Sequence, residues 1–423
     1  MARKEFTERY REGFIEDCSL TLLAERYGTP LYLYSKKTLQ ERVASFQKAF
    51  LPIDPLIRYS CKANSNLYLL KIIRECGCGV DVISAGEIAI ALAAGFQPSQ
   101  LIMEGPGKRK EELEFALEKR VSFFSVESLS ELRALNRIAG RRRKRIMVLL
   151  RLNPNIPAGG HRYITTGRKE NKFGLTEEEV VTTLKERNNY HHLEIAGLHL
   201  HLGSQIATPE PYLKAIRKAR QLYKICPFGF LDLGGGFPIA YDKKVAAIEL
   251  FGKAICKEIN GWDVKVIFEP GRYLVAESGF LLTRVIYRKD RPHKRFLVVD
   301  AGMNDLVRPS LYGAYHHIQA VKRFRGKKTL FDVVGPICES GDFLGKERFL
   351  PEKIKEGDLL LIAEAGAYGF AMASNYNGRL RPAEVLVDGA DHYLIRQRED
   401  FASLLAQFPK QGEQSLQGEI LGT

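Results

Sequence analysis

The sequence lacks any run of about 18 or more apolar residues, the length that an α-helix needs to cross a lipid bilayer. Residues 1–8 also lack the apolar core of a secretory signal peptide. With 45% hydrophobic and 27% charged residues, the chain of 423 residues has the composition of an ordinary soluble globular protein. We therefore expect a cytoplasmic protein without a membrane span, long enough for a barrel of about 250 residues and a second domain.

Disulfide bonds and a bound metal are not expected either. The seven cysteines are an odd number and lie far apart in the sequence, which is typical of reduced thiols in cytoplasm. Cys76 and Cys78 are close together, but no second Cys or His pair lies at the spacing of zinc ligands. We therefore interpret these two cysteines as structural.

The net charge of +14 raises the question of nucleic-acid binding. The basic residues, however, are spread along the chain, and the one dense run, 141–145, directly precedes a predicted strand. A solvated turn explains this run as well as a phosphate contact does, and no aromatic residues alternate with it. We expect no nucleic-acid partner. The positive charge suits attraction of an anionic cofactor and a dicarboxylate instead.

Short apolar runs alternate with amphipathic helical stretches such as Lys110–Leu117 and Leu129–Ile138 from residue 56 to about residue 270. Eight such runs favour a closed (β/α)8 barrel of the TIM type, although the pattern alone does not exclude an open, doubly wound sheet. The predicted strands are Leu56–Ser60, Val80–Ile83, Leu101–Met103, Ser122–Ser125, Ile146–Leu152, Ile195–Leu200, Phe230–Leu233 and Val264–Phe268.

After about residue 280 the pattern changes to short β-like runs separated by Gly, Pro and Asp turns, which predicts an all-β domain. Pro30–Tyr34 reads as a strand before the barrel, and we assign it to that β domain. The predicted division is an N-terminal segment over 1–34, a barrel over 35–279, a β domain over 280–410 and a polar tail over 411–423.

Four polar motifs fall where barrel strands end, the face on which barrel enzymes build their sites. The first is Lys62, after the strand 56–60. A lysine in this position is where a barrel would hold an amine that forms an imine with an aldehyde. The alternative is a solvated lysine, which is the commoner case for one residue taken alone.

The second motif contains His199 and His201, after the sixth strand. Strand alternation puts both on the same side, so both are expected to face the pocket, where a flat imidazole can pack on an aromatic ring. The alternatives are a core histidine or a metal pair. Because no carboxylate is adjacent in the sequence, the metal pair is the weaker of these.

The third and fourth motifs follow the last two strands. Gly234–Gly236 lets backbone N–H groups approach and hold a phosphate, although a triple glycine is equally often a tight turn. Glu269 could hold a protonated pyridine nitrogen and Arg272 a phosphate or carboxylate, and the alternative is a structural ion pair. An amine, a flat histidine, a phosphate loop and a carboxylate are together what pyridoxal 5′-phosphate requires.

From about residue 30 to about residue 395, the chain resembles the alanine-racemase-like (fold type III) pyridoxal-phosphate decarboxylases. Motifs common to that family are Tyr59-Ser-Cys-Lys-Ala-Asn64, Ser84-Ala-Gly-Glu87, His201-Leu-Gly-Ser204, Gly234-Gly-Gly236 and Glu269-Pro-Gly-Arg272. Motifs that resemble its diaminopimelate branch are His161-Arg-Tyr-Ile-Thr-Thr-Gly167, Lys172-Phe-Gly174, Arg308-Pro-Ser-Leu-Tyr312, Ala314-Tyr-His316, Cys338-Glu-Ser-Gly-Asp-Phe343, Gly366-Ala-Tyr-Gly-Phe370, Ser374-Asn-Tyr-Asn377 and Arg381-Pro-Ala-Glu384.

The resemblance implies a role for each candidate residue. Lys62 forms the imine with the cofactor, and Cys338 donates a proton to the carbanion of the partner subunit's site, so that the active unit is a homodimer. The implied cofactor-binding residues are Lys62, His201, Ser204, Gly234, Gly235, Gly236, Glu269, Gly271, Arg272 and Tyr368. The implied substrate-binding residues are Arg272, Arg308, Tyr312, Glu339 and Tyr368.

The implied reaction is decarboxylation of meso-2,6-diaminopimelate to L-lysine and CO2, the last step of lysine synthesis. The alternative is a decarboxylase of ornithine, arginine, lysine or carboxynorspermidine. A homologue that has lost catalysis is disfavoured because Lys62, Glu269 and Cys338 are all present. A free cysteine is often a small core residue, but the polar sequence around Cys338 argues against that reading.

Overall fold

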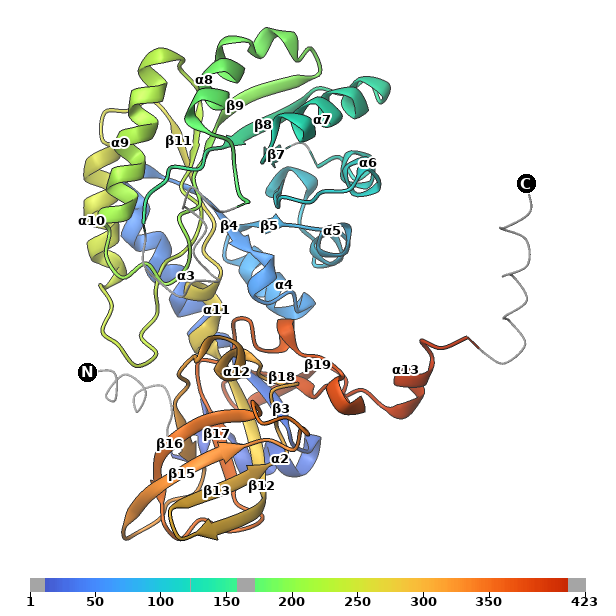
Figure 1. Cartoon of the computed structure of the whole chain (residues 1–423), viewed down its shortest axis with the longest axis vertical. Coiled ribbons are helices and arrows are strands. Elements are labelled where there is room, and N and C mark those ends of the chain that lie inside the picture. The colour runs from blue at the N-terminus through green and yellow to red at the C-terminus, as the bar shows by residue number, and fades with distance from the viewer. Residues whose placement is uncertain (1–11, 122, 158–171, 410–423) are drawn as a thin grey trace.

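The computed structural model describes residues 12–121, 123–157 and 172–409. It consists of a closed barrel of parallel strands and a separate sheet domain, which lie end to end (Figure 1). The predicted polar tail and the motif at 161–167 lie outside the described residues. The predicted domain boundaries themselves stay predictions.

The barrel is closed by eight parallel strands, so the expected TIM-type barrel is confirmed and the open sheet is excluded. Each predicted strand overlaps one of these strands, which are β4 (Leu56–Ser60), β5 (Gly79–Val82), β6 (Leu101–Met103), β7 (Phe123–Val126), β8 (Ile146–Arg151), β9 (Leu193–His199), β10 (Phe230–Asp232) and β11 (Lys265–Phe268). The helices around them are α3 (Lys36–Phe50), α4 (Leu67–Glu75), α5 (Ala85–Ala93), α6 (Lys110–Glu118), α7 (Leu129–Arg141), α8 (Glu177–Lys185), α9 (Glu210–Ile225) and α10 (Ile248–Ile259).

Side chains that alternate along the strands give the barrel interior two layers. One layer is apolar and includes Ile102, Phe123 and Ile267. Two residues further along each of these strands, the same face carries Glu104, Ser125 and Glu269, because the side-chain period of a strand is two. The polar layer therefore lies at the carboxyl ends of the strands, above an apolar plug that keeps water out from below. Leu149 and Ala196 also belong to the apolar layer.

The sheet domain is built around β12 (Gly279–Arg291), which pairs with β13, β17 and β3. The strand β3 (Leu31–Ser35) comes before the barrel in the sequence and pairs with β12 and β18. The prediction that the N-terminal segment joins the β domain is therefore confirmed for this strand. The remaining strands of this sheet are β13 (Lys294–Val299), β14 (Ile318–Ala320), β15 (Lys328–Val334), β16 (Phe343–Pro351), β17 (Leu359–Ile362), β18 (Ala383–Asp388) and β19 (Asp391–Arg396).

Two short helices, α11 (Arg272–Val275) and α12 (Arg308–Tyr312), lie where the barrel meets the sheet domain (Figure 1). The same junction holds a buried hydrogen-bond network. Glu384 of β18 accepts hydrogen bonds from Tyr34 (2.6 Å) and from Asn66 Nδ2 (2.9 Å). Since Asn66 follows the turn that contains Lys62, the sheet domain helps to fix the loop on which that lysine stands.

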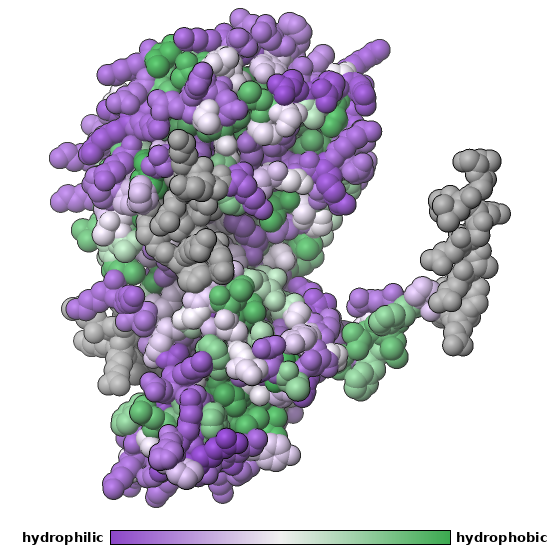
Figure 2. Space-filling view, in the orientation of Figure 1, coloured by the Kyte–Doolittle hydropathy of each residue, from purple (hydrophilic) through white to green (hydrophobic). Residues whose placement is uncertain are grey.

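Among the residues that the structure describes, none of the helices has the length and apolar character to cross a bilayer. In the view of Figure 2 the barrel surface is largely hydrophilic. An apolar patch is visible on the arm that carries α13 (Phe401–Leu405), which projects from the sheet domain beyond β19 (Figures 1 and 2).

Gly252 allows a close contact between two barrel helices, α10 and α3. A Cβ atom on this residue of α10 would collide with the carbonyl oxygen of Ala49 in α3. We expect Gly252→Ala to lower the free energy of unfolding by about 1–3 kcal/mol, seen as a lower melting temperature, because the helices must move apart. The control is Gly86→Ala in α5, where the nearest atom to a new Cβ is 3.7 Å away. The control should be neutral or stabilising, and equal losses in both variants would contradict the packing argument.

Candidate active site

Lys62 lies in a single turn of 3-10 helix, Cys61–Ala63, directly after β4. Its Nζ atom is 3.4 Å from Asp81 Oδ2 of β5, and the same oxygen accepts a hydrogen bond from Ser60 (2.7 Å). Burial lowers the pKa of Lys62, but the negative charge of Asp81 and its neighbours outweighs burial and leaves that pKa above its ordinary value. The amine is therefore held as an ammonium ion next to a carboxylate.

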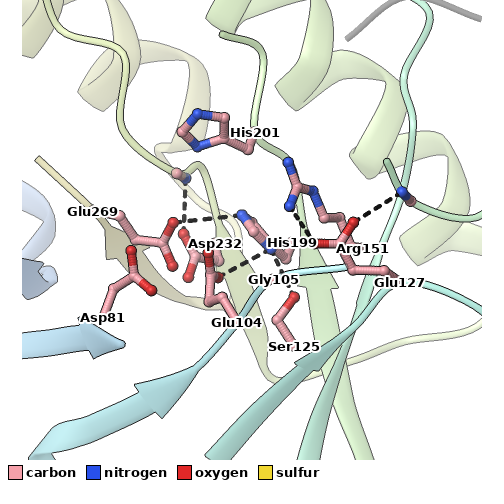
Figure 3. Close-up of polar contacts among 12 residues, drawn as sticks. Asp81, Glu104, Gly105, Ser125, Glu127, Arg151, His199, His201, Asp232 and Glu269 are labelled. Carbon is pink, nitrogen blue, oxygen red and sulfur yellow. Dashed lines mark hydrogen bonds and ion pairs between the residues drawn. The ribbon is translucent and has the colours of Figure 1, made fainter. Parts of the chain in front are cut away.

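Glu269 follows β11 and is the centre of a buried carboxyl cluster with Asp81, Glu104 and Asp232 (Figure 3). Both carboxyl oxygens of Glu269 are buried without a hydrogen-bond partner in the described part of the chain. Burial, followed by the charges of Asp232 and Glu104, raises the pKa of Glu269 well above its ordinary value. A buried carboxyl in this state calls for a cationic donor, which the ring nitrogen of a bound cofactor can supply.

His199 is fully buried within this cluster. Its Nδ1 atom lies 2.7 Å from Ser125 Oγ and 3.1 Å from Glu104 Oε1, and its Nε2 atom lies 3.5 Å from Glu269 Oε2. Burial, with Arg151 nearby, lowers the pKa of His199 well below its ordinary value, so the ring is neutral. The His199 ring therefore lies inside the barrel, between Glu104 and Glu269.

The fold brings to His199 carboxylates that the neighbouring sequence lacks. No carboxylate is near His199 in the sequence, but Glu104 and Glu269 reach it from other strands. His199, His201 and Glu269 lie close enough to share an ion, as do Asp81, Glu104 and Glu269. Sequence adjacency could not reveal this, since barrel strands bring distant residues together.

His201 lies two residues beyond His199, outside the strand, and is half-buried. The two rings are 6.3 Å apart and inclined by 75°. The backbone N–H of Gly235 donates to His201 Nδ1 (3.4 Å), so the ring is attached to the glycine loop after β10. Burial lowers the pKa of His201 as well, which favours the neutral, flat ring that can pack on an aromatic cofactor.

Gly234–Gly236 forms a cradle that side chains would fill. Gly234 and Gly236 have positive φ angles of 64° and 97°, which glycine adopts without strain. A Cβ on Gly235 would collide with the carbonyl oxygen of Glu269, and one on Gly236 would lie 2.5 Å from the carbonyl oxygen of Gly203. Backbone N–H groups in such a loop can approach a phosphate closely.

Ser204 and Arg272 lie together in the structure. Arg272 donates from Nε (3.3 Å) and Nη2 (3.1 Å) to Ser204 Oγ. Gly271, which precedes Arg272, packs so closely on the turn of Lys62 that a Cβ would lie 2.9 Å from that of Ser60. The structure thus joins the loops after β4, β9 and β11 into one site.

Arg272 and Arg308 form a second charged group at the junction with the sheet domain. Both are buried, and among the described residues neither forms an ion pair with a carboxylate. Arg272 Nη1 donates to Tyr241 Oη (2.9 Å), and the guanidinium of Arg308 lies over the same ring at 5.2 Å. Burial lowers the pKa of Arg308. Two buried guanidinium groups without a carboxylate partner in the described part of the chain have the chemistry to bind an acidic ligand.

Tyr368 and Tyr312 complete this side of the pocket. Tyr368 has a positive φ of 56°, and its N–H donates to Ala63 O (2.8 Å), which places it against the turn of Lys62. The Arg272 guanidinium lies 4.8 Å from the centre of the Tyr368 ring. Tyr312 is half-buried at the end of α12, and its ring lies 5.9 Å from the guanidinium of Arg308.

Cys338 and Glu339 lie apart from the residues described so far. Both are exposed on the loop between β15 and β16. The N–H of Cys338 donates to Asn377 Oδ1 (2.8 Å), and Glu339 Oε2 accepts from Tyr376 Oη (3.4 Å). Within the described residues, no hydrogen bond or ion pair joins either of them to Lys62, His201 or Glu269.

Sequence reasoning missed four residues of the site. Asp81 and Asp232 lie inside or at the end of apolar strands, and a buried aspartate there was an available signal. Glu104 directly follows the apolar run of β6 and gave the same signal. Tyr241 lies in a loop with nothing in the sequence around it to single it out.

The assembled residues fit pyridoxal 5′-phosphate. The site has an amine for the aldehyde, a flat neutral imidazole, a glycine cradle with Ser204 and Arg272 for the phosphate, and an unpartnered buried carboxyl for the ring nitrogen.

The barrel also matches a known family model. Residues 36–276 match the pyridoxal binding domain of the pyridoxal-dependent decarboxylases. The fold, the site and this match define a pyridoxal-dependent decarboxylase of the barrel type.

Similar proteins narrow the class. The chain is 43% identical over 402 residues to the diaminopimelate decarboxylase of Aquifex aeolicus, an alignment that covers 93% of this chain and 95% of that protein. It is 44% identical over 399 residues to that of Neisseria meningitidis serogroup A, with 93% and 98% covered. The crystal structure of the Helicobacter pylori diaminopimelate decarboxylase with L-lysine superposes with a TM-score of 0.87 at 38% identity, covering 92% of this chain and 98% of that one. The chain belongs to the diaminopimelate decarboxylase family.

The buried carboxyl groups predict a pH-dependent stability for the cofactor-free protein. Burial raises the pKa of Glu104 from 4.5 to about 8. Between these values the unfolded chain has released a proton that the folded chain keeps, so this residue's contribution to stability falls as the pH rises. Relative to Glu104→Gln, the wild-type melting temperature should fall from about pH 5 to about pH 8 and level off above that. A difference that rises with pH would contradict the assignment.

Proposed function

We propose that this protein decarboxylates meso-2,6-diaminopimelate to L-lysine and CO2 in the cytoplasm, as the last step of lysine synthesis. The observation that carries the proposal is the pair of buried arginines, Arg272 and Arg308, beside the Lys62 pocket. They suit a substrate that keeps a carboxylate after CO2 is lost. The family of the chain and the lysine-bound Helicobacter pylori relative support the same reaction.

The proposed cofactor is pyridoxal 5′-phosphate. When bound, it supplies a conjugated ring that withdraws the electron pair left on the substrate α-carbon as CO2 leaves. Lys62 would hold the cofactor covalently, His201 would pack on its ring, and Glu269 would bind the ring nitrogen. Ser204, Gly234, Gly235 and Gly236 would hold its phosphate, with Arg272 beside Ser204. Gly271 and Tyr368 would contact the cofactor next to the turn of Lys62.

Lys62 also moves protons. Its ammonium is paired with Asp81, which can stabilise the charged form whenever the amine has been released from the cofactor. Glu269 must be ionised to keep the ring nitrogen protonated, and the cationic ring nitrogen lowers the cost of that charge. The apolar layer beneath the site excludes water on that side.

The second amino-acid head of the substrate lies far from the reacting carbon. Arg308, with Arg272, can bind its carboxylate in bidentate fashion, and the hydroxyl groups of Tyr312 and Tyr368 can add hydrogen bonds. Glu339 can pair with its ammonium group. A substrate without the distal carboxylate would leave buried guanidinium groups unpaired, which strongly disfavours it.

Cys338 is proposed to protonate the α-carbon in the site of a partner subunit. Its exposure and its lack of contacts with Lys62 in the same chain support this arrangement. A homodimer with shared sites would bury the loop of Cys338. It could also cover the arm of α13, where Phe401, Leu405 and Phe408 are 70%, 63% and 66% exposed. Phe401 and Leu405 are four residues apart on α13 and lie on one face of that helix, and Phe408 follows its end.

A substrate panel tests the reaction. With pyridoxal 5′-phosphate supplied, CO2 release should be fastest from meso-diaminopimelate and at least about 100-fold slower from lysine, ornithine and arginine. Arg308→Gln should reduce kcat/KM for meso-diaminopimelate by about 100-fold or more, because one charged hydrogen-bond donor pair is lost. The control is Arg284→Gln on the sheet-domain surface, which should leave kcat/KM unchanged. Preference for ornithine would overturn the proposal.

Mixed subunits test the shared site. Lys62→Ala and Cys338→Ala should each be inactive alone. In a one-to-one mixture about half of the dimers are mixed, and each carries one intact site of two, so about a quarter of the wild-type activity should return. Absence of recovery in a mixture shown to have exchanged subunits would favour sites that lie within one chain.

A further inference from the structure

Glu104 has no role in the function proposed above, yet it lies in the same buried cluster as Glu269 (Figure 3). Its side chain is 2% exposed. In the described part of the chain, no backbone N–H, lysine or arginine donates a hydrogen bond to its carboxyl group, and its Oε1 atom is buried. Two near neighbours can share a hydrogen with this carboxyl group, Glu269 and His199, and the Nδ1 atom of His199 is 3.1 Å from Glu104 Oε1.

His199 lies between Glu104 and Glu269, with one ring nitrogen directed at each. Nδ1 is near Glu104 and near Ser125 Oγ, which is 2.7 Å away, and Nε2 is 3.5 Å from Glu269 Oε2. A neutral imidazole carries a single hydrogen. If Nε2 carries it, His199 donates to Glu269 and Nδ1 must accept. If Nδ1 carries it, Nε2 can only accept, and Glu269 receives no hydrogen bond from this ring.

Charge balance indicates which form is present. Asp81 accepts hydrogen bonds from Lys62 and Ser60, and Asp232 accepts one from the N–H of Gly234. Glu269 faces the ring nitrogen of the cofactor. Glu104 has no such compensation, and burial raises its pKa to about 8. With Glu269 ionised opposite that ring nitrogen, Glu104 is the carboxyl next to His199 that can keep a proton and donate it.

We propose that Glu104 is a positioning residue for Glu269. Its O–H donates to Nδ1 of His199, which leaves the Nε2–H of His199 to donate to the Glu269 carboxylate. The inference rests on the proposed function, because it needs a protonated ring nitrogen opposite Glu269. The charged and titratable groups that face Glu104 and His199 are Lys62, Asp81, Lys108, Arg151, His201, Asp232 and Glu269.

Cofactor binding to the full-length, cofactor-stripped protein tests the proposal. Two ligands are compared: pyridoxal 5′-phosphate and its 1-deaza analogue, in which carbon replaces the ring nitrogen. Glu104→Leu should weaken binding of the natural cofactor by about tenfold and binding of the analogue by less than about twofold. Glu104→Gln should bind both like the wild type, because its amide N–H can still donate to Nδ1. Glu87→Gln, at a nearby carboxyl that accepts a hydrogen bond from the N–H of Ile83, is the matched control.

The outcomes separate this inference from the proposed function. Equal weakening of both ligands by Glu104→Leu would mean a merely structural role, and a Glu104→Gln variant as weak as Glu104→Leu would mean that a donor is not what matters. Either result overturns the inference. Failure of the wild-type protein to bind pyridoxal 5′-phosphate would overturn the proposed function instead.

The tautomer of His199 gives a second measurement that needs no disruptive variant. In the holoenzyme labelled with 13C and 15N histidine, the NMR signals of His199, identified by their loss in His199→Asn, should report a hydrogen on Nε2. The Glu104→Gln holoenzyme should report the same form. A hydrogen on Nδ1 in the wild-type holoenzyme would overturn the inference, whatever the Leu variant does.

Discussion

The structure of the site depends on the burial of carboxyl groups at one end of the barrel. Asp81, Glu104, Asp232 and Glu269 all lie out of water, around the ammonium group of Lys62. Burying charge without compensation costs several kcal/mol per group in real proteins. The folded chain reduces this cost by keeping protons and by pairing Asp81 with Lys62, and the proposed ring nitrogen of the cofactor would compensate Glu269. The same cluster therefore explains the raised pKa values and the fit of the cofactor.

Two regions of opposite charge determine how a ligand can be oriented in the site. The carboxyl cluster lies inside the barrel, whereas the buried arginines Arg272 and Arg308 lie at the junction with the sheet domain. Arg272 connects the glycine cradle with the arginine pair, because it contacts Ser204 at the cradle and Tyr241 beside Arg308. A ligand with an anionic end and a cationic ring can be bound in one orientation only, since the reverse would place like charges together.

Much of the fold and part of the site could be predicted from local patterns. Apolar runs located the barrel strands, and polar motifs at strand ends pointed to Lys62, Gly234–Gly236 and Glu269, because both signals lie within a few consecutive residues. The surroundings of His199 could not be predicted in this way. They depend on the side chains that neighbouring strands β6, β7 and β11 turn into the barrel, and strand order and register set those contacts.

The strand β3, from the first part of the chain, pairs with strands from its last part. During synthesis β3 emerges before the barrel, but its partners β12 and β18 emerge hundreds of residues later. The loop after Lys62 obtains its hydrogen bond from Asn66 to Glu384 only at that stage. A ribosome-bound chain with a finished barrel would thus still have an incomplete lysine loop. Completion of the lysine loop is in this way coupled to completion of the polypeptide, so a chain that stops early lacks the hydrogen bond from Asn66 that fixes this loop to the sheet domain.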